Sequence, residues 1–286
     1  MSPGPPLPVT LVRAPNPGPL TGPGTNTWIV GREELVVVDP GPLDASHLDA
    51  VVAAAAPLGR ISRIVCTHHH PDHREGALAL AARTETLVGV FHSTAQAPAE
   101  LPLRDGDRIE AGAHHLRCVH TPGHAADHLC LLAEDDGACF FGDHLLGGMT
   151  TVIDPPDGNL GTYLRSLDRL QALRPRIGYP GHGPILADPV AEIATVRAHR
   201  LEREAQIVAA LAALAGGPAT PAALVPGIYR AYPETLWPAA ARTVLAHLEK
   251  LAEEGRVVAE PGPAGTGETF RLSPGAATGG GPGSRS

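Results

Sequence analysis

The densest group of potentially reactive side chains lies between Thr67 and His73, where the sequence reads Thr-His-His-His-Pro-Asp-His. It directly follows an apolar run that ends at Cys66, so a loop at the end of a buried strand is expected to carry these side chains. Placing several imidazoles beside a carboxylate is costly unless a cation compensates. Neutral imidazole and ionised carboxylate are both good zinc donors, with bonds of about 2.0–2.2 Å. The segment therefore predicts a metal site.

The order of residues within this loop suggests two binding points. Alternate side chains of an extended segment face opposite sides. His68 and His70 can then point together, with His69 between them facing away from the metals. Asp72 and His73 follow a proline and are expected to turn toward a second point, at the start of the next helix.

Three later residues share one context, because each comes just after an apolar strand and next to a glycine. They are His124, Asp143 and His182. Loops at strand ends can converge on one face of a rigid scaffold, and the adjoining glycines let the backbone turn sharply there. Each residue alone is ambiguous, since a single histidine beside a glycine is more often a turn or surface residue. Together with the loop after Cys66 they form a specific pattern.

This pattern closely resembles the metallo-β-lactamase superfamily, whose signature is H-x-H-x-D-H followed by a distal His, Asp and His. The resemblance runs from about residue 25 to residue 184, with every position filled. It implies an α/β fold, the four-layer αββα metallo-β-lactamase sandwich. It also implies that a first metal is bound by His68, His70 and His124, and a second by Asp72, His73 and His182, with Asp143 bridging the two.

The resemblance further implies two zinc ions per chain. Two cations about 3.5–4 Å apart share a water and lower its pKa toward neutrality, which yields a metal-bridging hydroxide without a Ser or Cys nucleophile. Asp72 and Asp143 are the expected catalytic carboxylates, because Asp72 can aim the hydroxide and Asp143 holds both metals. Iron or manganese in place of zinc would change the cofactor but leave this geometry intact.

Asp39 follows the apolar run that ends at Val38 and matches the family's acidic residue behind the ligands. There it would orient an imidazole from behind; the alternative is a helix-cap or turn carboxylate. Other histidines are interpreted more plainly. His128 and His144 flank the site and are left open between substrate contact and support of the ligands. Surface or strand positions are expected for His47, His92, His114, His115 and His247.

The alternation of apolar runs and amphipathic stretches predicts a layered α/β domain followed by helices and a β-hairpin. The pattern divides the chain into an irregular N-terminal segment, 1–23, the catalytic domain, 24–187, a connecting helix, 188–215, a small winged-helix-like domain, 216–272, and a disordered tail, 273–286.

Composition bears on the cellular location of the protein and on its partners. Of 286 residues, 43% are hydrophobic, yet no run approaches the roughly 18 apolar residues of a membrane helix. The N-terminus lacks the pattern of a signal peptide, so a cytoplasmic protein with no membrane partner is expected. The net charge of −8 argues against a broad grip on nucleic acid, though a local basic groove remains compatible with it. Four cysteines stand singly inside apolar runs, as expected of buried, reduced thiols.

Several branches of the superfamily fit poorly. A β-lactamase would carry an export signal and lacks the bridging carboxylate that Asp143 supplies. Nucleases with a β-CASP domain need a large insertion before the last histidine, and the stretch between Asp143 and His182 is too short for one. Flavodiiron proteins place a carboxylate where His70 stands.

The segments 25–27, 120–128, 181–184 and 199–207 resemble the beta-lactamase-like protein 2 group, which also ends in a winged-helix-like domain. That group includes a single-strand-specific endoribonuclease, so the resemblance favours a phosphodiesterase acting on single-stranded RNA. Relatives in polyketide pathways instead hydrolyse carrier-protein thioesters, and segment 67–73 also resembles glyoxalase II, so a thioester hydrolase is the alternative.

A non-enzymatic winged-helix regulator is a weaker alternative, because no ligand position is missing. Residues 216–275 carry five basic and six acidic side chains, a net charge of −1, whereas a DNA-reading winged helix is usually basic. The C-terminal domain is therefore expected to shape a substrate groove or a subunit interface, as in a homodimer.

Overall fold

The computed structural model describes residues 6–92, 94, 97–262 and 267–274. The chain divides into two compact units. The first comprises residues 1–151 and 162–196, and the second comprises residues 152–161 and 197–286. The predicted disordered tail lies outside the described residues from position 275 onward.

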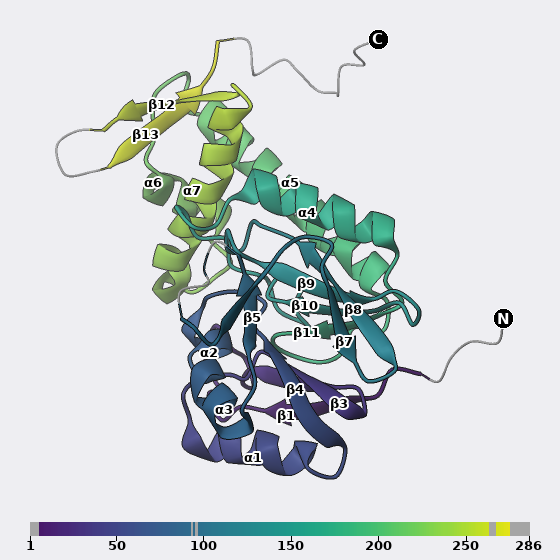
Figure 1. Cartoon of the computed structure of the whole chain (residues 1–286). Helices are drawn as coiled ribbons and strands as arrows, with labels where there is room; N and C mark the ends of the chain where they lie inside the picture. The colour runs from purple at the N-terminus through teal and green to yellow at the C-terminus, as the bar shows by residue number, and fades with distance from the viewer. Residues whose placement is uncertain (1–5, 93, 95–96, 263–266, 275–286) are drawn as a thin grey trace. The chain divides into compact units, whose positions relative to one another are not determined.

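The first unit contains a six-stranded sheet whose strands follow chain order, and Figure 1 labels its strands β1, β3, β4 and β5. They are β1 (Val9–Arg13), β2 (Asn26–Val30), β3 (Glu33–Val38), β4 (Gly59–Val65), β5 (Val88–Phe91) and β6 (Glu100–Leu103). The strands from β3 to β6 are parallel, whereas β1, β2 and β3 pair antiparallel. Helices α1 (Ala45–Ala55) and α3 (Ala77–Thr84) cover one face, where Leu48 and Leu80 pack with Val37 and Ile64. Burial on both faces explains the continuous apolar run Leu35–Val38 of β3 and the apolar residues of β5, all of which are buried.

A second sheet of five strands lies against the other face of the first. Its order is β11 (Ile177–Pro180), β10 (Ala138–Gly142), β9 (Leu129–Ala133), β8 (His114–His120) and β7 (Arg108–Ala111). Trp28 and Val36 of the first sheet share one core with Leu116, Leu131 and Phe140 of the second. Helix α4 (Leu160–Leu173) is hydrogen-bonded to the β8–β9 loop: Ser166 Oγ donates to Pro122 O at 2.8 Å. The predicted αββα sandwich is confirmed.

Three strands escaped the sequence interpretation. The segment 1–23 was expected to be irregular, but β1 pairs along its whole length with β2. Its five residues stand among prolines and carry too little alternation to indicate a strand, and the sheet edge supplies the pairing. Strands β6 and β7, with four residues each, are shorter still. The helix expected after the histidine loop is preceded by a separate short one: α2 (Pro71–Arg74) begins at Pro71, and α3 follows from Ala77.

The second unit is a helical domain with a hairpin. Its elements are the part of α5 (Pro189–Ala212) from residue 197, α6 (Pro221–Ile228), the short 3₁₀ helix η1 (Glu234–Leu236), α7 (Trp237–Glu253), β12 (Val257–Pro261) and β13 (Glu268–Leu272). Thr220 caps α6 by accepting from Ala223 N. Leu211, Val244 and Phe270 share its core. Helices followed by an antiparallel hairpin confirm the winged-helix arrangement. Among the described residues, no helix has the length and apolar character needed to cross a bilayer.

Candidate metal centre

The seven predicted ligands lie on loops that follow four strands of the two sheets. The loop after β4 and helix α2 carry four of them, and the loops after β8, β10 and β11 carry one each. Backbone hydrogen bonds join these loops. Leu129 N donates to Thr67 O at 2.7 Å, and Gly181 N donates to Gly142 O, also at 2.7 Å. The strand ends therefore hold the ligands within reach of one another.

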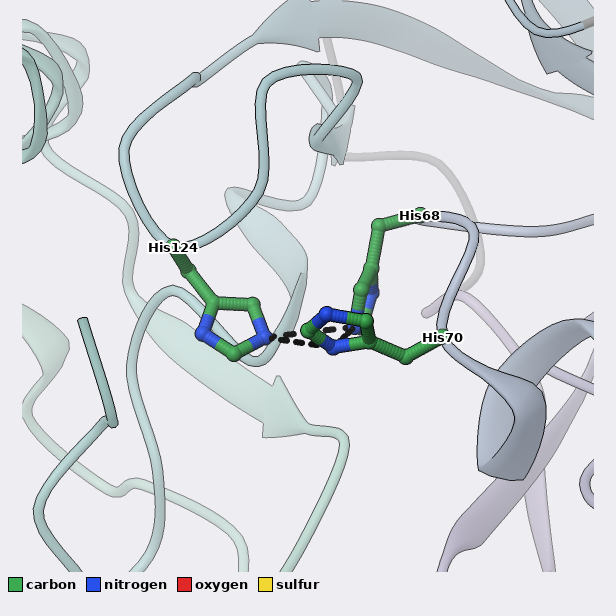
Figure 2. A group of neighbouring side chains, drawn as sticks. All are labelled: His68, His70 and His124. Carbon is green, nitrogen blue, oxygen red and sulfur yellow. Dashed lines mark hydrogen bonds between the residues drawn. The ribbon is translucent and has the colours of Figure 1, made fainter. Parts of the chain in front are cut away.

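His68, His70 and His124 form the first cluster (Figure 2). His68 and His70 come from one loop, and the ring of His124 approaches them from another. His70 Nδ1 lies 2.9 Å from His68 Nε2 and 3.1 Å from His124 Nε2, and the latter two atoms are 3.3 Å apart. Three ring nitrogens thus converge on one point, as the alternation in the sequence predicts.

Asp72, His73 and His182 form the second cluster. Asp72 Oδ2 lies 3.2 Å from His182 Nε2 and 3.4 Å from His73 Nε2. Asp143 stands between the two clusters. Its Oδ1 lies 3.3 Å from His73 Nε2 and 3.4 Å from His182 Nε2, whereas its Oδ2 lies 3.8 Å from His124 Nε2. Each oxygen of this carboxylate therefore faces a different cluster, which is the geometry of a bridge.

The electrostatics of the two clusters differ. Burial lowers the pKa of His68 well below its ordinary value and lowers the pKa of His70 to about 4, with neighbouring histidines adding to the shift. Burial also opposes protonation of His182, but the neighbouring carboxylates of Asp143 and Asp72 outweigh it and raise its pKa to about 9. His73 behaves alike, since Asp143 and Asp39 raise its pKa despite complete burial.

The donors fit divalent cations. Within the described part of the chain, His73 Nε2 and Asp143 Oδ1 are buried and make no hydrogen bond, although buried polar atoms are normally bonded. The two atoms face each other across 3.3 Å, and a cation beside both would satisfy them. Imidazole nitrogens and carboxylate oxygens suit zinc, and iron or manganese accept the same donor types. The composition of the site therefore suits divalent cations.

Residues 20–182 match the Metallo-beta-lactamase superfamily. The chain belongs to this superfamily. It is a metallo-hydrolase, and residues 220–265 match the Beta-lactamase associated winged helix domain. The site and the appended domain thus agree with the resemblance inferred from the ligand spacing.

Similar proteins come from distant organisms. The chain is 35% identical over 219 residues to the atrochrysone carboxyl ACP thioesterase of Aspergillus chevalieri, covering 72% of this chain and 69% of the relative. It is 32% identical over 260 residues to the beta-lactamase-like protein 2 homolog of Drosophila melanogaster, covering 85% and 87%. Among solved structures, a metallo-beta-lactamase family protein of Thermus thermophilus aligns with a TM-score of 0.74 at 26% identity, covering 93% and 98%.

Asp39 lies behind the ligands and supports them. It is not the cap of the following helix, because Asp44 caps α1. The Asp39 carboxylate accepts from Thr67 N at 2.7 Å and from Thr67 Oγ1 at 2.8 Å, and it lies 2.9 Å from His73 Nδ1. A carboxylate only accepts, so His73 Nδ1 carries the proton and its Nε2 faces the second cluster.

The same carboxylate acts on the first cluster through Thr67. Because the Thr67 hydroxyl proton points to Asp39, Thr67 Oγ1 can accept from His68 Nδ1, 3.0 Å away. His68 then presents an unprotonated Nε2 to the first cluster. One buried carboxylate thus selects the tautomers of two ligands, one in each cluster.

Some contributors to the site were missed or misplaced by sequence reasoning. His47 was expected at the surface or in a strand, but it is buried on α1. Its Nε2 lies 2.9 Å from Thr27 Oγ1, which donates to Asp39 O at 2.6 Å. His69 Nδ1 lies 2.9 Å from Asp127 Oδ1, a buried carboxylate that was not singled out. For His47 a signal was available, since it adjoins Leu48 on the apolar face of α1.

Proposed function

We propose that this chain is a dinuclear zinc hydrolase, and that Asp143 bridges the two metals. The observation that carries the proposal is the placement of its carboxylate. Oδ1 of Asp143 lies 3.3 Å from His73 Nε2, while Oδ2 lies 3.8 Å from His124 Nε2. With one oxygen toward each cluster, this carboxylate can contact a cation in both.

When two cations are bound, they supply a water of lowered pKa and polarise the electrophile. The protein's own part is positional. Asp72 is the most accessible carboxylate of the ligand set, with 27% of its side chain exposed against 12% for Asp143. Its lone pairs can accept a hydrogen bond from the attacking water and aim it at the substrate. Asp39 keeps the two imidazoles in the tautomers that leave Nε2 free to bind.

An acyl thioester carried by an acyl carrier protein is our first candidate substrate. The thioesterase of Aspergillus chevalieri, at 35% identity, supports it by name. The net charge of −8 favours it over RNA only indirectly, since an acidic chain has little electrostatic attraction for a polyanion.

Single-stranded RNA, which the sequence alone favoured, is the second candidate. The length of the sequence match supports this candidate. The match to the beta-lactamase-like protein 2 homolog extends over 85% of this chain, more than the 72% matched by the thioesterase.

A side-by-side activity panel on the zinc-loaded protein tests both candidates. The substrates are a carrier-protein acyl thioester, an unstructured RNA oligonucleotide and a lactone, with Asp143→Ala and a chelator-treated sample as controls. We expect thioester hydrolysis that disappears in both controls. Metal-dependent RNA cleavage without thioester hydrolysis would reverse the ranking, and inactivity on all three substrates would contradict both candidates.

A further inference from the structure

His128 is fully buried four residues after the ligand His124, yet it belongs to neither ligand cluster. Both of its ring nitrogens are engaged by the protein. The backbone N–H of Asp143 donates to His128 Nε2 at 3.2 Å. On the other side of the ring, His128 Nδ1 lies 2.9 Å from Thr121 Oγ1. The ring therefore connects the β8–β9 loop to the backbone of the bridging residue.

The direction of these hydrogen bonds follows from the chemistry of their ends. A backbone N–H can only donate, so His128 Nε2 must offer a lone pair and the proton of the neutral ring must sit on Nδ1. Nδ1–H then donates to Thr121 Oγ1. The hydroxyl proton of Thr121 is directed to Cys130 Sγ at 3.3 Å, and Cys130 Sγ lies 3.7 Å from Phe141 O. Every donor in this series of hydrogen bonds has an acceptor.

Close packing leaves the Asp143 backbone little freedom to leave the ring. Gly142 has a φ of +49°, and a Cβ at this position would lie 2.7 Å from His128 Nε2 and 2.6 Å from Thr67 Oγ1. Only glycine lets the backbone approach the ring so closely. The main chain of His128 is held in turn, because Thr121 N donates to His128 O at 2.9 Å.

We propose that His128 is a positioning residue that holds the Asp143 carboxylate between the two cation positions. It does so as the Nδ1–H tautomer, by accepting the Asp143 N–H, and Thr121 selects that tautomer. The inference rests on the proposed two-metal site. The hydrogen bond sets the orientation of the peptide before Asp143, and this orientation directs the Cα–Cβ bond toward both clusters. Loss of the bond would let the carboxylate turn toward one cluster.

Two substitutions of His128 separate its acceptor from its bulk. His128→Gln can keep an oxygen near the position of Nε2, whereas His128→Asn keeps a polar group near Nδ1 and loses the acceptor for Asp143 N–H. Zinc affinities are measured by competition with a chromophoric chelator. We expect the weaker-bound zinc of His128→Asn to lose about 10–100-fold in affinity, the usual cost of removing a group that supports a ligand. His128→Gln should stay within a few fold of the wild type.

Thr121 provides a second matched pair. Thr121→Ser keeps the hydroxyl and should behave as the wild type, whereas Thr121→Val removes the acceptor for Nδ1–H and should reproduce the weaker zinc binding of His128→Asn. Equal affinities in Thr121→Val and Thr121→Ser would contradict the role of Thr121 as tautomer selector.

The tautomer of His128 is measured from long-range ¹H–¹⁵N spectra of the wild-type protein. A purely structural role for this histidine would not require one particular tautomer. We expect a protonated Nδ1 and an unprotonated Nε2 on His128. An Nε2–H tautomer, or equal zinc affinities for His128→Asn and His128→Gln, would overturn the inference. A wild-type protein that holds one zinc would instead contradict the proposed two-metal function, and the spectra would still decide the tautomer of His128.

Discussion

Oδ2 of Asp39 lies 2.9 Å from Nδ1 of His73, and this contact joins the end of β3 to a ligand on α2. Asp39 makes it from a left-handed backbone conformation, with a φ of 52°. Such a conformation costs a non-glycine residue about 1–3 kcal/mol. The Asp39 main chain is held in place because its N–H donates to Val65 O at 2.9 Å and its carbonyl accepts from Thr27 Oγ1.

Replacing Asp39 with Asn is expected to weaken both cation positions. The amide can donate to His73 Nδ1, which would move the ring proton to Nε2 and block the metal-binding atom; through Thr67 the same exchange reaches His68. We expect zinc affinity to fall about 10–100-fold, measured by chelator competition. Asp49→Asn is the matched control, because Asp49 is an exposed carboxylate paired with Arg83. Unchanged zinc binding in Asp39→Asn would contradict the assigned tautomers.

Asp143→Ala should abolish turnover and leave fewer than two zinc ions per chain, because the bridge offsets the mutual repulsion of the cations. His69→Ala is the comparison, since His69 lies in the same histidine run but contacts Asp127. We expect His69→Ala to retain two zinc ions and most of the activity. Elemental analysis and steady-state rates measure both effects, and comparable losses in the two variants would show that the assignment of side chains along the loop is wrong.

Zinc affinity should rise with pH. In the metal-free protein the pKa of His182 is raised to about 9 and that of His73 is also raised. Both rings are therefore doubly protonated and positively charged at pH 7. Cations must displace those protons, and binding releases them. The apparent affinity should therefore increase between about pH 6 and pH 9. Titration calorimetry at about pH 7 in buffers of different ionisation enthalpy should show proton release, and a pH-independent affinity would count against the raised pKa values.

Glu204→Gln should destabilise the C-terminal unit. Lys250 Nζ lies 2.7 Å from Glu204 Oε2, and the two side chains are 10% and 8% exposed. Removing one partner of a buried pair costs about 3–5 kcal/mol, and the lower end applies because Lys250 also contacts Glu254. Glu34→Gln breaks an exposed pair with Arg60 and should cost less than about 1 kcal/mol. Urea unfolding measures both; equal costs would mean that burial does not strengthen the Glu204 pair.

The ligand types and most of the regular elements were predictable from the sequence. The apolar runs that end at Val38 and Cys66 correspond to β3 and β4, because apolar runs in a sequence indicate buried strands. The histidine run was informative because placing so many imidazoles and a carboxylate in one loop costs free energy unless a cation is bound. Short edge strands such as β1 left no comparable signal, since their pairing comes from a neighbouring strand.

Only the tertiary structure decided how these residues act together. Whether Asp143 faces one cluster or both depends on the meeting of loops from β4, β8, β10 and β11. The supporting roles of Asp39 and His128 were undecided in the sequence for the same reason. A hydrogen bond has a direction and a distance, and both are set by packing between segments far apart in the chain. Residue spacing identifies the donors available to a site, whereas the packed sheets determine which atom of each ring remains free to bind.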